Sequence, residues 1–152
     1  MFEMFRKRNG KPAAGDPLEI LKESRRDLVR LADQIARHAE KAPYPHMAAE
    51  LRRMAGEKRA SADLLGDKVP LAGPPEESPL DLPSGKNHWE RMAQDLNDQN
   101  ALDNRLVERA ARLRETAPEL ADRLERIAAS DRRHAKLLMD LIARADPQAD
   151  QT

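Results

Sequence analysis

Residues 116–141 read TAPELADRLERIAASDRRHAKLLMDL, and this stretch decides the fold class. Thr116 and Glu119 form the pattern of a capping box, and Pro118 suits the first turn of a helix. Beyond them, the residues of one helical face recur at alternating intervals of four and three. The stretch therefore predicts a helix over residues 118–145 with an apolar buried face that two polar residues interrupt: Leu120, Leu124, Ile127, Asp131, His134, Leu138 and Leu141.

Three earlier segments carry similar signals. The first predicted helix starts after an Asp16 cap and ends at residues 42–45 (APYP), because a helix interior cannot hold two prolines so close together. The second ends near Gly66, and the third starts at an Asn87 cap. We therefore expect an all-α chain with helices over residues 17–42, 46–67, 87–115 and 118–145.

The segment between the second and third predicted helices has a different composition. Residues 69–86 contain five prolines and two glycines and show no helical period. About 18 extended residues can reach roughly 60 Å, whereas a helix of about 23 residues is roughly 35 Å long. We therefore predict a long crossover that runs the length of the bundle and leaves the second and third helices parallel.

The two halves of the chain resemble each other. One constant offset relates two leucines and an Ala-Pro turn in the two hairpins, namely Leu21, Leu31 and Ala42-Pro43 in the first and Leu96, Leu106 and Ala117-Pro118 in the second. Past the turn the offset is two residues shorter, and Lys58 then aligns with Asp131. The repeat predicts a four-helix bundle of two helical hairpins related by a pseudo-twofold axis.

The composition limits the function. The chain has 152 residues, which suits one domain, and it carries 27 basic and 27 acidic side chains. This balance gives no net field that would attract nucleic acid, and an aromatic content of 3% is too low for base stacking. The lack of cysteine excludes disulfides, thiolate nucleophiles and cysteine-ligated metals. With no apolar run of membrane-spanning length and no signal-peptide pattern, we expect a cytoplasmic protein.

The two ends of the chain lie outside the predicted bundle of residues 16–145. Residues 1–15 and 146–152 are expected to be flexible tails. Residues 1–8 (MFEMFRKR) combine apolar and basic side chains, which suits a weak contact with an anionic membrane surface or with a partner groove. The alternative is that residues 1–8 have no fixed structure. The sequence identifies no protein partner and leaves self-association open.

Polar residues interrupt the buried faces at matching heights. Asp103 and Asp131 lie about equally far from the turn at residue 117, so we expect them at one level, with His134 one turn further along. Lys58 is predicted to lie within ion-pairing reach of Asp131, because neither charge could stay buried alone. The predicted buried polar cluster is Lys58, Ser61, Gln99, Asp103, Asp131 and His134.

Other residues have simpler predicted places. Trp89 is placed on the buried face of the third helix, and His38 is expected to be a satisfied core or boundary histidine. His46 and His88 stand at helix starts, where we expect them to face solvent. The simplest interpretation of the paired arginines, such as residues 52–53 and 132–133, is that they lie on the solvent-exposed outer faces of their helices. They would form an anion-binding patch if the second and fourth helices are neighbours.

The fourth predicted helix resembles that of a known family. Ile127-Ala128, followed by residues 131–135 (DRRHA) and Leu138, is similar to the fourth helix of ferritin-like, rubrerythrin-type bundles. The resemblance implies a ferritin-like four-helix bundle with one long crossover between its second and third helices. It also implies a di-iron site, built from a carboxylate on each of two helices and a Glu-x-x-His pair on each of the other two.

The chain departs from that pattern at most ligand positions. Asp131 and His134 match one Glu-x-x-His pair, with aspartate in place of glutamate. Lys58 and Ser61 occupy the places of the other pair, and the first helix has no glutamate at the expected place. Glu57 lies beside the stripe rather than on it. The positive charge of Lys58 is therefore predicted where the family would bind a metal.

Two interpretations of the function remain. The first is a non-enzymatic bundle that has lost its di-iron site, holds no cofactor and has a binding, assembly or structural role. The alternative is a metal-binding protein with a reduced site, in which Asp103, Asp131 and His134, with or without Glu57, hold iron or zinc for redox or storage chemistry. The sequence favours the first, and it assigns no catalytic residue.

Overall fold

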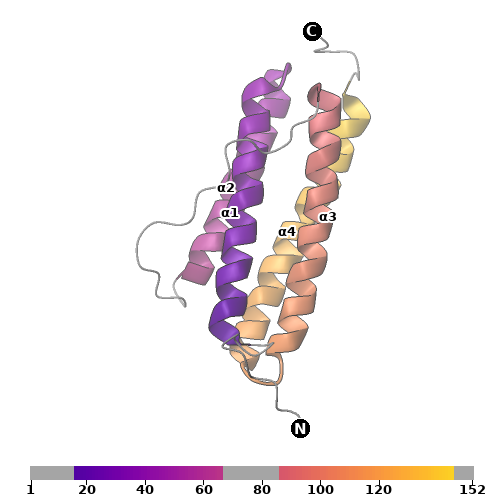
Figure 1. Ribbon diagram of the computed structural model, residues 1–152. Coiled ribbons are helices and arrows are strands. Elements are labelled where there is room, and N and C mark those ends of the chain that lie inside the picture. The colour runs from indigo at the N-terminus through magenta and orange to yellow at the C-terminus, as the bar shows by residue number, and fades with distance from the viewer. Residues whose placement is uncertain (1–15, 67–85, 146–152) are drawn as a thin grey trace.

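The computed structural model describes residues 16–66 and 86–145. Within these ranges the chain forms four α-helices and no strand (Figure 1). They are α1 (Pro17–Lys41), α2 (Pro45–Gly66), α3 (His88–Leu113) and α4 (Pro118–Arg144). The predicted all-α class is confirmed, and every predicted helix end agrees to within two residues. The predicted tails and nearly all of the predicted crossover lie outside the described residues.

Capping side chains explain where two of the helices begin. Asp16 and Asn87 accept hydrogen bonds from backbone N–H groups in the first turns of α1 and α3, at 3.1 and 2.9 Å. The capping box predicted at Thr116 is wrong, because Ala117 is the N-cap of α4 and no side chain caps that end. Pro118 in the first turn has no N–H group, which reduces the need for a cap there.

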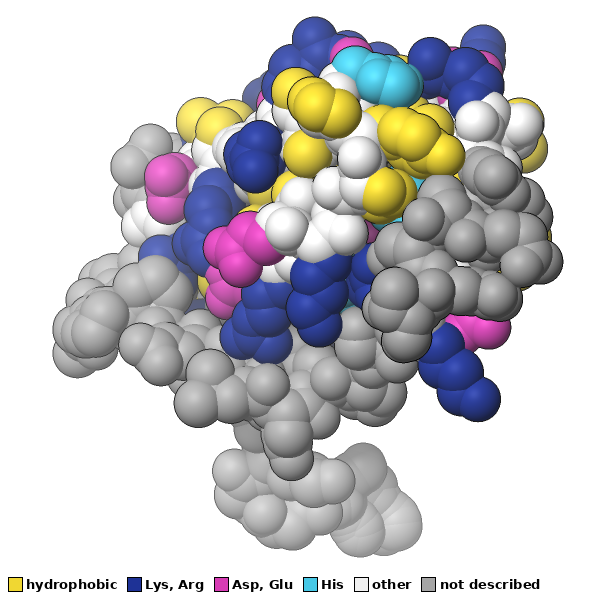
Figure 2. Space-filling model, turned by 90° about the horizontal axis from the view of Figure 1, so that it is seen from above, with side chains coloured by type: hydrophobic (Ala, Val, Ile, Leu, Met, Phe, Trp, Pro, Cys, Tyr) yellow, Lys and Arg dark blue, Asp and Glu magenta, His cyan; other side chains and the backbone are white. Residues whose placement is uncertain are grey.

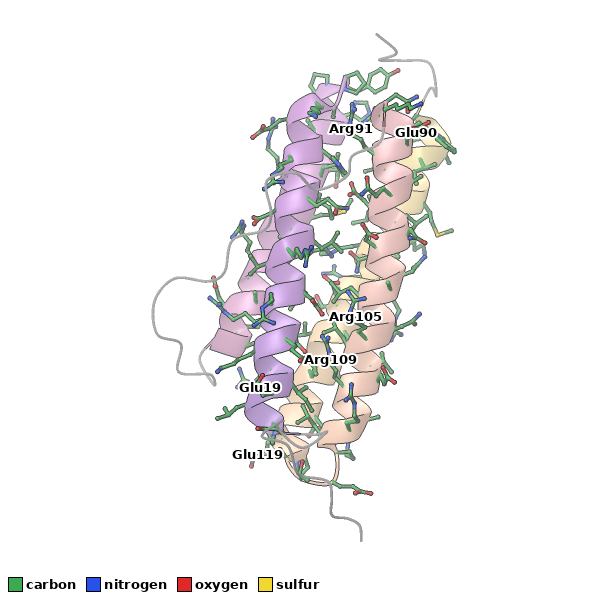
Figure 3. The ribbon with its side chains drawn as sticks, viewed as in Figure 1. Glu19, Glu90, Arg91, Arg105, Arg109 and Glu119 are labelled. Atoms are coloured by element: carbon green, nitrogen blue, oxygen red, sulfur yellow. The ribbon has the colours of Figure 1, made fainter. Side chains whose placement is uncertain are left out.

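Two antiparallel hairpins, α1–α2 and α3–α4, pack side by side. They meet where α3 lies against α1 and α4 lies against α2. Arg105 and Arg109 point from α3 toward α1 in Figure 3, and Asp27 pairs with them at 3.2 and 2.8 Å. On the other side, Arg123 of α4 donates to the backbone carbonyl of Leu64 on α2 at 3.1 Å. The helix directions in Figure 1 leave α2 and α3 parallel.

The apolar stripes of all four helices form one core. Burying a Leu, Ile or Met side chain contributes about 1.5–3 kcal/mol, so this shared face is the main source of stability. No helix among the described residues combines the length and the apolar character that crossing a membrane requires. The large apolar side chains with less than 2% exposure are Leu21, Leu28, Ile35, Met47, Leu51, Met54, Leu65, Met92, Leu102, Leu106, Leu113, Leu124, Leu138 and Leu141.

The predicted face of α3 is wrong at its start. Trp89 is 37% exposed, whereas His88 is fully buried, so the buried face begins one residue earlier than predicted. His46 is exposed, as predicted, and His88 is not.

The ring of Tyr44 lies 6.4 Å from that of His88 and 6.1 Å from that of His46. Figure 2 looks down on this end of the bundle, where apolar side chains gather on the surface.

Candidate functional site

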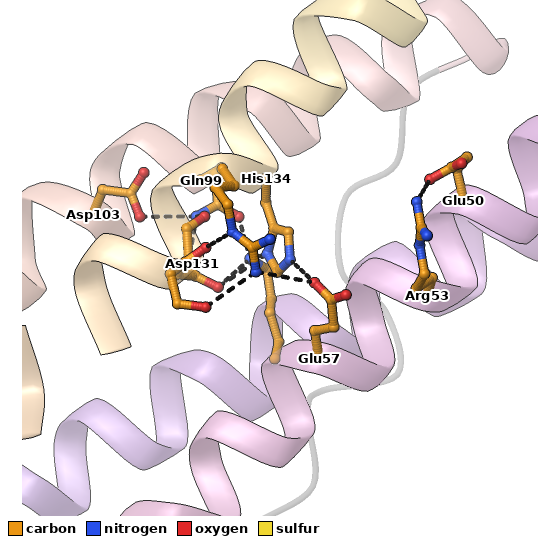
Figure 4. A network of polar contacts seen from close by, with 10 residues as sticks. Glu50, Arg53, Glu57, Gln99, Asp103, Asp131 and His134 are labelled. Carbon is orange, nitrogen blue, oxygen red and sulfur yellow. Dashed lines mark hydrogen bonds and ion pairs between the residues drawn. The ribbon is translucent and has the colours of Figure 1, made fainter. Parts of the chain in front are cut away.

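Polar side chains of α2, α3 and α4 meet around the amine of Lys58, which is fully buried on α2. Its Nζ lies 2.8 Å from Oδ1 of Asp131 and 2.8 Å from Nδ1 of His134, and it also donates to Oε1 of Gln99. Figure 4 shows Gln99, Asp131 and His134 converging on this point. The three N–H groups of an ammonium are thus matched by three acceptors. The predicted ion pair between Lys58 and Asp131 is present.

Gln99 links the lysine to two carboxylates. Its Nε2 donates to Oδ1 of Asp103 at 2.9 Å, and to Oδ2 and the backbone carbonyl of Asp131 at 2.6 and 3.2 Å. Its Oε1 faces the ammonium of Lys58. This orientation of the amide suits the charges around it, because the oxygen meets the cation and the two N–H groups of the nitrogen meet the carboxylates. Gln99 therefore connects α3 to both α2 and α4.

Asp131 is held in its charged form. It is 2% exposed, and burial alone would raise its pKa. The charge of Lys58 and hydrogen bonds from Lys58 and Gln99 outweigh the burial and lower the pKa of Asp131 to about 2. Asp131 is therefore the permanent anion of the cluster at neutral pH.

Asp103 has the opposite behaviour. Burial and the nearby charge of Asp131 raise the pKa of Asp103 to about 6, although Gln99 and the charge of Lys58 oppose the shift. Its Oδ2 is buried and has no hydrogen-bond partner among the described residues. An unpaired carboxylate oxygen in such a place favours the protonated form. Asp103 therefore titrates at about pH 6, well above the usual range of an aspartate.

Lys58 remains an ammonium because its neighbours need all three of its protons. Burial lowers the pKa of Lys58, while the charges of Asp131, Asp103 and Asp95 and the hydrogen bond to Asp131 limit the fall. A neutral amine has two N–H groups and would leave one of the three acceptors around Nζ unsatisfied. The geometry therefore favours the charged form despite the burial.

His134 connects the buried cluster to the surface through Glu57. Its Nε2 lies 2.8 Å from Oε1 of Glu57, a side chain that is 44% exposed, and Figure 4 shows Glu57 reaching across from α2. The hydrogen bond with His134 is the main reason why the pKa of Glu57 is lowered. Since Nδ1 accepts from Lys58, the ring proton belongs on Nε2 and is donated to Glu57. In that tautomer the 3.0 Å approach of Nδ1 to Asp131 is not a hydrogen bond.

Five of the six residues predicted for the cluster are buried, and the hydrogen bonds described above join them. Ser61 is the exception, since it is half-buried and forms no hydrogen bond with the described residues. Its neighbour Ala62 takes the fully buried position. Glu57 joins the cluster from outside the stripe, and its long side chain makes this possible.

A second polar cluster lies between α1 and α3. His38 Nδ1 lies 2.9 Å from both carboxylate oxygens of Asp95, and both residues are buried. Gln34 donates to Asp95 at 2.8 Å and to Asp98 at 2.9 Å. The prediction that His38 is a satisfied core histidine is confirmed. The sequence pattern did not predict Asp95 as a buried residue, because it placed Trp89 on the buried stripe of α3.

These residues do not fit a di-iron centre. Lys58 places an ammonium between Asp131 and His134, the two side chains that match the family motif. Asp103 is held by Gln99. Within residues 16–66 and 86–145, no group of three or more His, Asp or Glu side chains is arranged to hold a metal ion. The hydrogen bonds and the ion pair of Lys58 join α2, α3 and α4.

Searches of protein-family models, of curated proteins and of solved structures returned no match for this chain.

Proposed function

We propose that this chain is a non-enzymatic, ferritin-like four-helix bundle that has lost its di-iron site, with the Lys58 ammonium in the place of the metal. Its role is binding, assembly or structural support, with a protein partner or a second copy, in the cytoplasm. The proposal includes the long crossover between α2 and α3. One observation carries it, namely that Lys58 Nζ lies 2.8 Å from both Asp131 and His134.

Electrostatics explain why the lysine and a metal exclude each other. At an effective dielectric constant of about 20, a dication about 4 Å from an ammonium is repelled by about 8 kcal/mol. A metal could therefore bind between Asp131 and His134 only if Lys58 lost its proton or moved away. Neither is favourable, because the three acceptors around Nζ would then lose donors.

The cluster suits a structural role because it requires one alignment of three helices. Lys58 reaches Gln99 on α3 and Asp131 on α4 at the same time. A slip of one helix by a turn, about 5.4 Å, would separate these partners and leave a buried charge unpaired. The polar cluster thus favours one register, while the apolar stripes alone would tolerate several.

Restoring a carboxylate at position 58 tests the proposal. Lys58→Glu would place a carboxylate beside Asp131 and His134, and we expect it to bind zinc in a calorimetric titration and to gain thermal stability when zinc is added. Lys58→Gln is the matched control, since it removes the charge without adding a ligand. Zinc binding by the wild type as tight as by Lys58→Glu would refute the proposal.

A further inference from the structure

The groove between α2 and α4 lies directly over the buried cluster. These two helices pack less closely than the other neighbouring pairs, and a groove of about 820 Å³ opens between them. Glu57, which holds His134, lines this groove. Its volume lies within the range of about 300–1,000 Å³ that is typical of small-molecule sites.

The groove has an apolar wall on α4. Leu137, Met139 and Ala143 line it, and Met139 is 57% exposed, the highest value among the exposed large apolar residues of the described chain. A methionine side chain adapts its shape to an apolar ligand. Exposure of this side chain beside a groove leaves apolar surface that a ligand would cover.

Cations surround this wall. Arg53, Arg133 and Lys136 line the groove. Arg53 pairs with Glu50, and Arg133 lies 3.9 Å from Glu57, whereas Lys136 forms no ion pair within the described part of the chain. The two acids of the groove are already engaged, because Glu57 accepts from His134 and Asp140 pairs with Arg144 at 3.4 Å. The groove therefore offers positive charge next to an apolar surface, which fits an anion with an apolar body.

The shape of the apolar surface favours a single chain over a docked helix. A helix in a groove needs a row of apolar anchors at intervals of about three and four residues. Among the large apolar side chains exposed on the described residues, Met139 alone lines this groove. A single alkyl chain needs only one such apolar contact surface.

We propose that the α2–α4 groove binds a free alkyl carboxylate, with the chain against Leu137 and Met139 and the carboxylate near Arg133 and Lys136. The inference rests on the proposed function, since it names the ligand class of its binding role. Glu57 lines the groove and contacts His134, so it connects the proposed site to the Lys58 cluster.

Titration with decanoate below its micelle concentration, followed by protein NMR, tests this site. We expect saturable shifts at residues of α2 and α4 that line the groove, with decanol and acetate each binding at least about tenfold more weakly because one lacks the charge and the other the chain. Arg133→Gln with Lys136→Gln should weaken decanoate about tenfold or more. Met139→Ser should weaken it about fivefold.

Matched controls lie outside the groove. Arg126→Gln with Lys22→Gln removes two cations that do not line the groove, and Val107→Ser removes an apolar side chain that is 45% exposed. Both should leave decanoate affinity unchanged. Equal weakening by the control variants, equal affinity for decanol, or the absence of saturable shifts with decanoate would overturn the proposal. Metal content is measured on the same samples, so bound metal would refute the proposed function without affecting the decanoate result.

Discussion

Replacing Lys58 with methionine removes the charge of the cluster while keeping most of the side-chain volume. Asp131, at 2% exposure, would keep Gln99 as a donor but lose its ion pair. Breaking one side of a buried pair costs about 3–5 kcal/mol. The pKa of Asp131 is lowered from 3.8 to about 2, which corresponds to a stabilisation of the carboxylate by about 2 kcal/mol to which Lys58 contributes. We therefore expect Lys58→Met to lower the free energy of unfolding by about 3 kcal/mol at pH 7.

Guanidinium unfolding followed by far-UV circular dichroism measures this loss. Adding Asp131→Leu should recover much of it, because both buried charges are then gone. Lys22→Met, on a lysine that is 40% exposed, is the control and should change stability by less than about 0.5 kcal/mol. If Lys58→Met is as stable as the wild type, or if the losses of the two single variants simply add in the double variant, Lys58 and Asp131 do not form a coupled pair.

Three further predictions concern Asp103 and His38, which belong to the two polar clusters, and Trp89 at the start of α3. Because the pKa of Asp103 is raised from 3.8 to about 6, its contribution to stability is present below pH 4 and is lost as pH rises through 6. Asp103→Asn should therefore remove this loss, raising stability at pH 8 by up to about 3 kcal/mol in unfolding curves measured from pH 4 to 8. His38→Leu should cost about 2–3 kcal/mol in the same assay, since Asp95 loses a buried partner, and an unchanged midpoint would contradict this. Trp89→Ser should cost less than about 0.5 kcal/mol, whereas a core position would lose several times more.

The sequence predicted the helices well because each has strong local signals. Proline stops and asparagine or aspartate caps act within a few residues, and the structure forms the caps at Asp16 and Asn87. The pairing of Lys58 with Asp131 was also predictable, since the repeat gives both residues equivalent places. A buried charge must then find its partner on a facing helix.

The errors come from long-range packing that local patterns do not contain. The sequence pattern places Trp89 at the start of the buried stripe of α3. In the structure the buried face begins at His88, whose Nε2 lies 3.3 Å from the sulfur of Met47 on α2. Because of this one-residue shift, the sequence pattern predicted neither the burial of Asp95 nor its contact with His38. The sequence offers Glu57 only as an optional ligand of the alternative metal site, because it lies beside the stripe. Its contact with His134 depends on how far α2 and α4 lie apart, which no local pattern contains.

The metal content of the wild-type protein tests the central claim most directly. Protein purified without added metal and without chelator would be assayed for iron and zinc by elemental mass spectrometry, before and after dialysis against each metal. With Lys58 Nζ 2.8 Å from both Asp131 and His134, we predict far less than one metal ion per chain in every sample. One or two iron or zinc ions per chain, retained through gel filtration, would contradict the claim that an ammonium has replaced the metal.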